Sequence, residues 1–268
     1  MRVRLLLLTA WACLAVAVLA YVLRTEARLL RADPDVVPTS PALMAFAQRR
    51  GEASFASRCA SCHGVVGRGD LARGIPDLSD DDWLYGTGQL SDIEQVITYG
   101  IRSHNPKGWN LAIMPAYATA HPNSRDRNIL ARSPGDIGDL VEFLLFGTGN
   151  ANKPVSAEDP AAIARGAALF IGAGGCYDCH AQDAKGDASI GAPNLTDQIS
   201  LYGTSRDALL ASISFGRAGV CPAWVSRIRP VEIRELAVFV YTLSRPARMR
   251  VREPAVGPPS STHAPAAS

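Results

Sequence analysis

The chain has 268 residues, of which 47% are hydrophobic and 19% charged, and its formal net charge is +2. This composition excludes a chain that is disordered throughout, because such chains combine few apolar residues with a high net charge. The small net charge also argues against a nucleic-acid-binding protein, which normally presents a concentrated basic face. The six cysteines are too few for a disulfide scaffold of this length, so their spacing is more informative than their number.

An uncharged apolar segment, residues 5–23, lies near the N-terminus and follows Arg2 and Arg4. As a helix it would be about 28 Å long at ~1.5 Å per residue, which is close to the hydrocarbon thickness of a bilayer. We therefore predict a transmembrane anchor over residues 1–24. A signal peptide cleaved after Ala20 is the alternative, and both interpretations place the bulk of the chain outside the cytoplasm.

The rest of the chain divides into two segments of similar size, separated by stretches that contain Pro and Gly. The predicted organisation is a linker over 25–40, a first domain over 41–147, a second linker over 148–157, a second domain over 158–245 and a disordered tail over 246–268.

These two domains are copies of one another. The sequence CASCH at 59–63 recurs as CYDCH at 176–180, which is 117 residues later. Pro76 and Pro193 each follow the His of their motif by thirteen residues. The offset shrinks further along the chain, so the first copy carries two insertions, one before Met114 and one after Tyr117. Two copies are too few for a stacked repeat array, and the pattern indicates a duplicated domain.

Each copy opens and closes with a segment of helical periodicity. Ser40-Pro41 and Asp159-Pro160 predict helix starts, because Ser and Asp cap helices and Pro suits the first helical position. The closing segments place apolar residues at helical spacing: Ile137, Leu140, Val141, Leu144 and Leu145 in the first copy, and Ile233, Leu236, Val240 and Leu243 in the second. No sustained alternation predicts a strand, so the expected fold class is mainly α.

Cys-x-x-Cys-His is the attachment signature of c-type haem. The candidate residues for covalent attachment are Cys59 and Cys62 in the first copy and Cys176 and Cys179 in the second, with His63 and His180 as proximal iron ligands. A redox dithiol does not require the following His, and a zinc site would need two more nearby Cys or His in each copy. We therefore predict two covalently bound haem c groups.

The sixth ligand differs between the copies. Met114 follows His63 by fifty-one residues and precedes a Pro, and the second copy aligns Cys221 with it. We expect Met114 to bind the iron of the first copy and Cys221, as a thiolate, that of the second, which would then have the lower potential. An open coordination position beside Cys221 and a more distant ligand remain the alternatives.

Several motifs carry a resemblance to a known family. They are GAPNLTD at 191–197, LYG at 201–203, PAW at 222–224, DDDWLYG at 80–86 and MPA at 114–116. Together they resemble the membrane-anchored dihaem subunit of cbb3-type cytochrome c oxidases, subunit III. The resemblance implies an N-terminal transmembrane helix followed by two tandem class I cytochrome c domains. It also implies that the carbonyls of Pro76 and Pro193 accept the N–H of the proximal imidazoles.

The same resemblance implies an electron-transfer subunit that catalyses no bond chemistry of its own. Its expected partners are a donor cytochrome or quinol-oxidising complex and the catalytic subunits of the oxidase, and no nucleic acid. Its expected location is the bacterial inner membrane, crossed once, with the haem domains in the periplasm. The family has Met where Cys221 stands. A dihaem enzyme of sulfur oxidation that resembles thiosulfate dehydrogenase, with a Cys-ligated haem, is therefore the alternative function, and a freestanding soluble carrier is a third.

Overall fold

The computed structural model describes residues 2–123, 128–148, 159–197 and 200–245. The α-helices of this part are α1 (Arg2–Arg31), α2 (Pro41–Arg58), α3 (Ala60–His63), α4 (Leu90–Tyr99), α5 (Pro134–Glu142), α6 (Pro160–Ile171), α7 (Tyr177–His180), α8 (Arg206–Phe215) and α9 (Pro230–Leu243). Shorter elements are the 3₁₀-helices η1 (Pro34–Thr39) and η2 (Leu71–Arg73) and the π-helical turn η3 (Phe143–Gly147). The described residues form isolated β-bridges and no strand, which confirms the mainly α prediction. The predicted linker beyond residue 148 and the predicted tail lie outside the described residues.

Both predicted helix starts are present. The Ser40 side chain accepts a hydrogen bond from the backbone N–H of Leu43 at 3.5 Å, and Asp159 accepts one from Ala161 at 2.9 Å. Pro41 and Pro160 occupy the first position of α2 and α6. Each cap satisfies a backbone donor that the first helical turn leaves without a partner, and this fixes where the opening helix of each copy begins.

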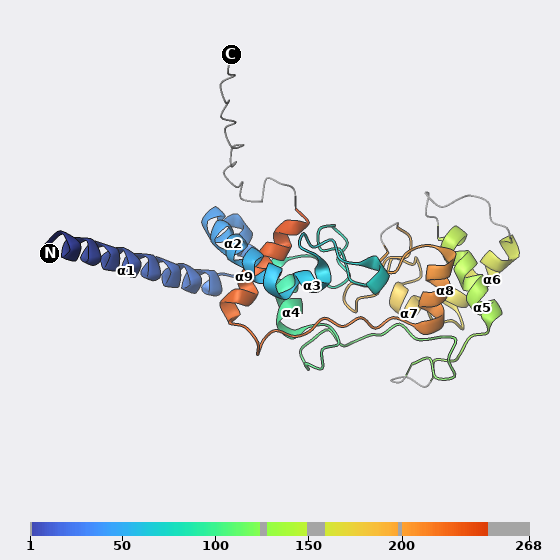
Figure 1. The fold of residues 1–268 in the computed structure, drawn as a ribbon. Coiled ribbons are helices and arrows are strands. Elements are labelled where there is room, and N and C mark those ends of the chain that lie inside the picture. Colours follow the sequence, from blue (N-terminus) through green and yellow to red (C-terminus); the bar gives the residue numbers. More distant parts are fainter. Residues whose placement is uncertain (1, 124–127, 149–158, 198–199, 246–268) are drawn as a thin grey trace, which may run out of the picture.

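The helices pack into two lobes that lie side by side (Figure 1). Helices α2, α3, α4 and α9 form lobe 1, in which α9 packs against α2 and α4, and α5 to α8 with η3 form lobe 2, in which α5 packs against α6 and α8. Lobe 1 therefore closes with the last helix of the second sequence copy, and lobe 2 with the last helix of the first. The packed units thus differ from the predicted domains 41–147 and 158–245, because the two copies exchange their closing helices.

A glycine marks the crossing of the opening and closing helices in each lobe. A Cβ atom on Gly51 of α2 would lie 2.0 Å from the carbonyl oxygen of Glu235 in α9, and one on Gly166 of α6 would lie 2.0 Å from that of Asp139 in α5. Only a residue without a Cβ lets the backbones approach this closely. Ring pairs flank the two crossings: Phe55 with Phe239 at 5.1 Å and Phe143 with Phe170 at 5.3 Å between centroids.

Two connecting segments carry the closing helices across. Residues 100–118 leave α4 toward lobe 2, residues 216–225 leave α8 toward lobe 1, and the two run side by side (Figure 1). Ile101 and Cys221 exchange both backbone hydrogen bonds, at 2.9 and 3.0 Å. Met114 and Arg217 do the same, at 3.0 and 3.2 Å. These four bonds satisfy backbone groups of both segments where they pass one another between the lobes.

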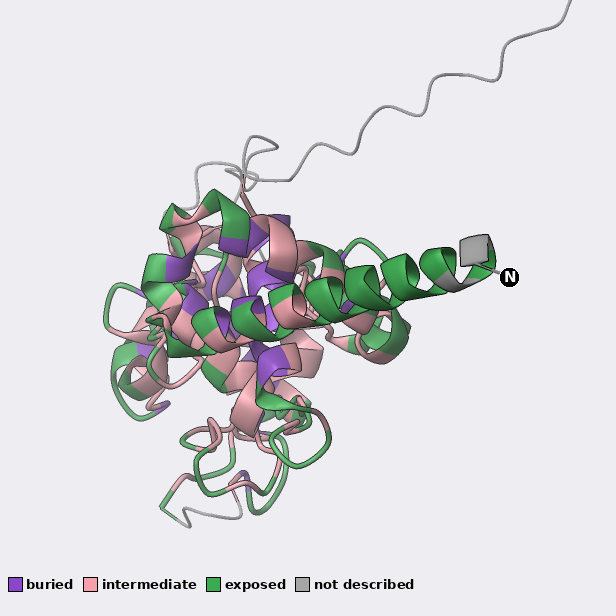
Figure 2. Ribbon diagram, turned by 90° about the vertical axis from the view of Figure 1, so that its left-hand side faces the viewer, coloured by how far each residue is buried: buried purple, intermediate pink, exposed green. Residues whose placement is uncertain are grey.

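Helix α1 projects from lobe 1, and most of its projecting length is exposed (Figure 2). The stretch Leu6–Arg31 is long and apolar enough to cross a membrane by length and composition, and none of its most apolar window is buried in the protein. A signal sequence near the N-terminus would share these properties. The C-terminal end of α1 differs, because Thr25 and Leu29 are buried. With Val37 of η1 also buried, residues 25–40 pack as part of lobe 1, whereas the sequence predicted a linker.

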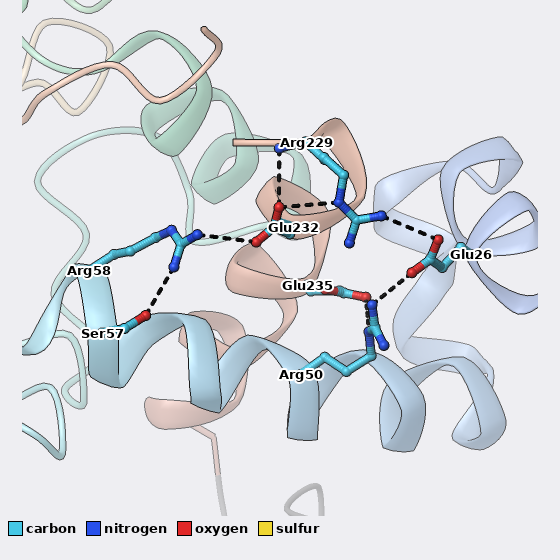
Figure 3. Close-up of polar contacts among 7 residues, drawn as sticks. All are labelled: Glu26, Arg50, Ser57, Arg58, Arg229, Glu232 and Glu235. Atoms are coloured by element: carbon cyan, nitrogen blue, oxygen red, sulfur yellow. Dashed lines mark hydrogen bonds and ion pairs between the residues drawn. The ribbon is translucent and has the colours of Figure 1, made fainter. Parts of the chain in front are cut away.

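A chain of ion pairs joins α1 to two helices of lobe 1 (Figure 3). Arg50 of α2 contacts Glu26 of α1 at 2.7 Å and Glu235 of α9 at 2.5 Å. Arg229 contacts Glu26 at 3.6 Å and Glu232 at 3.3 Å. Burial raises the pKa of Glu235, and the hydrogen bond from Arg50 opposes that shift. These ion pairs hold the C-terminal end of α1 against α9, the closing helix of the second sequence copy.

Arg234 of α9 adds a further set of contacts between α9, α1 and α4. Its side chain is buried and donates to the carbonyls of Leu29 and Ala32, at 2.9 and 3.0 Å, and to the carboxylate of Glu94 at 2.8 Å. The last carbonyls of a helix lack intrahelical partners, so one guanidinium satisfies the C-terminal end of α1 and ties it to α4. Lobe 1 and the end of α1 are therefore one packed unit.

Candidate haem sites

The attachment motifs lie on two short helices, α3 in lobe 1 and α7 in lobe 2. In lobe 1 the backbone N–H groups of Cys62 and His63 donate to the carbonyl of Cys59, at 3.1 and 2.9 Å. The motif of lobe 2 has the same two bonds, at 3.3 and 2.9 Å. This single turn sets the two thiols of each motif one turn apart and brings the His to the end of the helix. No described cysteine forms a disulfide.

The chemistry of each motif fits a covalently attached porphyrin. Burial raises the pKa of the Cys59 and Cys176 thiols to about 11. No cluster of three or more His, Cys, Asp or Glu that could hold a metal ion occurs within the described residues, so the zinc alternative finds no ligand set there. Two thiols and one imidazole in each lobe match the requirements of haem c instead.

A proline carbonyl lies beside the imidazole of each attachment motif. The Nδ1 atom of His63 lies 3.3 Å from the carbonyl oxygen of Pro76, and that of His180 lies 3.1 Å from the carbonyl oxygen of Pro193. With Nδ1–H donating to the carbonyl, Nε2 is left as the iron ligand. Burial is the main cause of the lowered pKa of both histidines, and it favours the neutral imidazole that a metal requires.

The loop between His63 and Pro76 depends on Gly69. Its N–H donates to the carbonyl of His63 at 2.9 Å, its φ is +68°, and a Cβ there would lie 2.4 Å from the Pro76 carbonyl oxygen. Gly186 makes the same contacts in lobe 2. Both the backbone conformation and the lack of space exclude a side chain, so this glycine keeps the proline carbonyl beside the imidazole.

Met114 lies in lobe 2 with the second attachment motif. Its side chain packs against the buried cluster of that lobe, which also contacts Cys176 and Leu195. Tyr117 is buried three residues later and donates its hydroxyl to the carbonyl of Gly174 at 3.1 Å, close to the start of the motif. The sequence had placed Met114 with the first motif, so the structure differs from that expected pairing.

Cys221 lies in lobe 1 with the first attachment motif. Its thiol is close enough to Cys59 and Cys62 for their charges to add to burial in raising the pKa of Cys221 to about 11. Trp224 anchors the same segment by donating its backbone N–H to the carbonyl of Thr98 in α4 at 3.1 Å. Met114 and Cys221 lie on the two connecting segments that lead to the closing helices. Each therefore reaches the lobe opposite to its own copy, together with the closing helix that follows it.

A symmetric pair of tyrosines forms the junction between the lobes. The Tyr85 ring packs directly against Gly191, where an added Cβ would lie 2.1 Å from it. The Tyr202 ring packs in the same way against Gly74, where an added Cβ would lie 2.2 Å from it. The guanidinium of Arg217 lies 4.0 Å from the centroid of the Tyr202 ring, and Arg102 lies over Tyr85. The repeated Leu-Tyr-Gly motif identified these tyrosines in the sequence, but nothing in it indicated that each contacts the opposite lobe.

Comparison with known proteins agrees with these sites. Residues 48–146 match the sequence profile of cytochrome c, and residues 161–240 match that of cytochrome c oxidase, cbb3-type, subunit III. The chain is 37% identical over 219 residues to the cbb3-type cytochrome c oxidase subunit FixP of Azorhizobium caulinodans, with 82% of this chain and 67% of that protein covered. Against the subunit CcoP of Cereibacter sphaeroides, identity is 33% over 216 residues, covering 81% and 68%. The chain belongs to the FixP/CcoP family.

Further FixP proteins match over a smaller share of their length. The subunit FixP of a Bradyrhizobium species is 37% identical over 210 residues, which cover 77% of this chain and 64% of the relative. The chain thus spans about two thirds of the length of these FixP/CcoP relatives. Membership confirms the resemblance predicted from the motifs, and the cytochrome c profiles imply covalently bound haem c. The relatives named here give no support to the sulfur-oxidation alternative.

Proposed function

We propose that this FixP/CcoP homologue is a membrane-anchored dihaem c-type cytochrome that relays electrons to the other subunits of a cbb3-type oxidase. One observation carries the proposal: each lobe joins an attachment motif from one copy to a sulfur side chain from the other. Cys221 reaches the first motif, and Met114 reaches the second. Two such sets of candidate haem ligands in one chain suit an electron relay.

The proposed iron ligands are His63 and Cys221 for the first haem, attached at Cys59 and Cys62, and His180 and Met114 for the second, attached at Cys176 and Cys179. Each haem supplies reversible one-electron chemistry when bound. A thiolate donates more strongly to ferric iron than a thioether does, so Cys221 would give the first haem a lower potential than the second. Pro76 and Pro193 support the arrangement by fixing the proximal imidazoles.

The proposed location is the bacterial inner membrane, with α1 as a single span and both lobes in the periplasm. Both lobes lie beyond the C-terminal end of α1, whereas Arg2 and Arg4 are at its N-terminal end (Figure 1). The contacts of Arg234 and Arg50 hold lobe 1 directly on that end, so the first haem would lie nearer the membrane than the second. A donor cytochrome or a quinol-oxidising complex and the oxidase catalytic subunits are the proposed electron-transfer partners.

A haem count and a spectroscopic redox titration of the purified holoprotein test this proposal. We expect two haems per chain and two well-separated potentials. Cys221→Met should raise only the lower potential, because it replaces a thiolate by a thioether at the first haem. A single haem would contradict the dihaem relay, and two equal potentials in the unaltered protein would contradict thiolate ligation by Cys221.

A further inference from the structure

Three buried side-chain atoms in the described part of the chain have no hydrogen-bond partner there, namely Nε1 of Trp109, Nε of Arg132 and Oε2 of Glu142, and the first of them lies beside lobe 1. The indole Nε1 of Trp109 is shielded from solvent and makes no hydrogen bond within that part. An indole N–H can only donate, so its missing partner must be an acceptor. Buried polar groups are almost always satisfied, and an unsatisfied one points to a group that the protein atoms do not include.

Trp109 lies close to the sulfur candidate of lobe 1. It belongs to the insertion that precedes Met114, and its backbone N–H donates to the carbonyl of Gly100 at 3.0 Å while its carbonyl accepts from Arg102 at 3.1 Å. Trp109 thus forms a parallel β-bridge with Ile101, and Ile101 forms an antiparallel β-bridge with Cys221, so the Ile101 segment lies between the other two. Two strand spacings of ~4.8 Å put the backbones of Trp109 and Cys221 about 10 Å apart. Cys59, Cys62, His63 and Cys221 would hold the first haem, so Trp109 lies on a segment that borders this proposed site.

The surroundings of the indole favour an anionic acceptor. The Trp109 ring packs edge-on against Tyr85, with 5.6 Å between the centroids, and the guanidinium of Arg102 lies 5.8 Å from the same Tyr85 ring. Arg102 is held in place by bonds to the carbonyls of Gly219 and Ala112, at 2.6 and 3.0 Å. A permanent cation next to an unpaired donor is the arrangement that binds a carboxylate.

We propose that Trp109 and Arg102 form a carboxylate-binding site at the junction of the lobes, and that its ligand is a propionate of the first haem. The inference rests on the proposed function, since it needs a haem in lobe 1. Cys59, Cys62 and the segment that carries Cys221 would hold that haem in lobe 1, so its carboxylates are the anions that the proposed function itself would supply at this place. A free small carboxylate from solution is the competing source.

The site has no full equivalent at the second haem. Arg217 lies over Tyr202 as Arg102 lies over Tyr85, but the second copy lacks the insertion that carries Trp109. The extra donor therefore acts on one haem only. A hydrogen bond to a propionate draws part of its negative charge toward the donor, which weakens the stabilisation of ferric iron by that charge and so disfavours the ferric state.

The test uses the holoprotein and the variant Trp109→Phe, with Trp224→Phe as a matched control in which another half-buried indole is removed. Trp109→Phe should lower the potential of the first haem, leave that of the second unchanged and abolish one hydrogen-bonded indole N–H signal in ultraviolet resonance Raman spectra. Trp224→Phe should leave both potentials in place. Unchanged potentials in folded Trp109→Phe, or a shift confined to the second haem, would overturn the proposal.

Two further measurements make the outcome decisive. If Trp109→Phe does not fold, a variant with Trp11, Trp83 and Trp224 replaced by Phe leaves Trp109 as the source of the indole signal in the Raman spectrum. An indole N–H without a hydrogen bond in that spectrum would overturn the proposed site. Acetate added to the unaltered protein should not change this signal, whereas a response to acetate would assign the site to a free anion. Two haems without the Trp109 effect would refute this inference alone, and a single haem would refute the proposed function.

Discussion

Ile101 and Cys221 exchange both of their backbone hydrogen bonds, at 2.9 and 3.0 Å, although 120 positions of the chain separate them. This pairing holds the Cys221 thiol against lobe 1 and leads α9 onto α2 and α4. The matching pairing of Met114 with Arg217 does the same for lobe 2. The two halves of the chain are therefore interdependent, and in the proposed haem sites each half supplies the sulfur ligand of the other.

The crossing of α2 and α9 predicts a strong effect of Gly51→Ala. The new Cβ would lie 2.0 Å from the Glu235 carbonyl oxygen, and backbone cannot yield as a flexible side chain does. We expect the free energy of unfolding of the holoprotein to fall by about 1–3 kcal/mol, as overpacking usually costs. Denaturant unfolding followed by circular dichroism measures this.

Gly138→Ala is the matched control for that substitution. Gly138 lies in α5, and a Cβ there would meet no atom within 4 Å. Alanine should stabilise the helix by roughly 0.5–1 kcal/mol, because it loses less conformational entropy than glycine on folding. If Gly51→Ala and Gly138→Ala had equal effects, the close contact between α2 and α9 would not exist in solution.

The contacts of Arg234 predict that the end of α1 depends on the closing helix of the other copy. Arg234→Met removes the bonds to the Leu29 and Ala32 carbonyls and leaves Glu94 without this cation. The loss should approach the ~3–5 kcal/mol that removing one partner of a buried pair costs. Hydrogen exchange should speed up over residues 25–40 while the haem spectra stay unchanged.

Arg58→Met provides the comparison. Arg58 pairs with Glu232 at 3.3 Å, but both side chains are partly exposed, so its removal should cost only about 0–1 kcal/mol. Hydrogen exchange over residues 25–40 should stay at the rate of the unaltered protein. Equal protection of that segment in Arg234→Met and the parent protein would show that α1 is held by other contacts.

Two aspartates predict opposite dependences of stability on pH. Burial raises the pKa of Asp80 to about 6 from an ordinary 3.8, so the folded state binds this proton more tightly than the unfolded state. The unfolding free energy should therefore fall as pH rises from about 4 to about 6 and stay lower above that. Asp80→Asn should be more stable than the parent protein at pH 7, with the difference vanishing below pH 4.

Asp187 should behave in the opposite sense. Hydrogen bonds from Ser189 lower the pKa of its carboxyl, so its ionised form stabilises the folded state above the ordinary pKa and loses that effect as pH falls. Asp187→Asn should be less stable than the parent protein at pH 7 and equal to it in strong acid. Thermal melts at several pH values compare the two variants, and changes of the same sign would refute the assigned environments.

Gly69 predicts a link between backbone shape and haem potential. Gly69→Ala would press a Cβ against the Pro76 carbonyl, which accepts the His63 N–H. A weaker bond makes the imidazole a poorer donor and should raise the potential of the first haem alone. Gly64→Ala has a similar φ but open space around the Cβ, so it should leave both potentials unchanged. Equal shifts in both variants would implicate backbone strain rather than the hydrogen bond.

The sequence predicted the elements of the haem sites better than their combination. The two Cys-x-x-Cys-His motifs, the distances to Pro76 and Pro193 and the capped starts of α2 and α6 are local features, and each is present where expected. The pairing of closing helices is not local. Because both copies present equivalent glycines and aromatic residues at the helix crossing, α2 fits either closing helix, and the repeat pattern looks the same for both arrangements.

The sequence patterns also failed to predict that the C-terminal end of α1 packs into lobe 1. Residues 25–40 contain prolines and charges and were predicted as a linker, but Thr25, Leu29 and Val37 are buried against helices distant in the sequence. Trp109 was missed because nothing local distinguishes an unpaired indole from one that packs in a core. Its position beside Ile101 and Tyr85, which the sequence does not reveal, is the basis for assigning it to the proposed carboxylate site.

An experimental structure of the holoprotein, at a resolution that separates the ligand atoms of each iron, tests the exchanged arrangement most directly. We predict that the iron bound by His180 is coordinated by the thioether of Met114, and that the iron bound by His63 is coordinated by the thiolate of Cys221. Coordination of Met114 to the iron bound by His63, with α5 packed on α2, would contradict it.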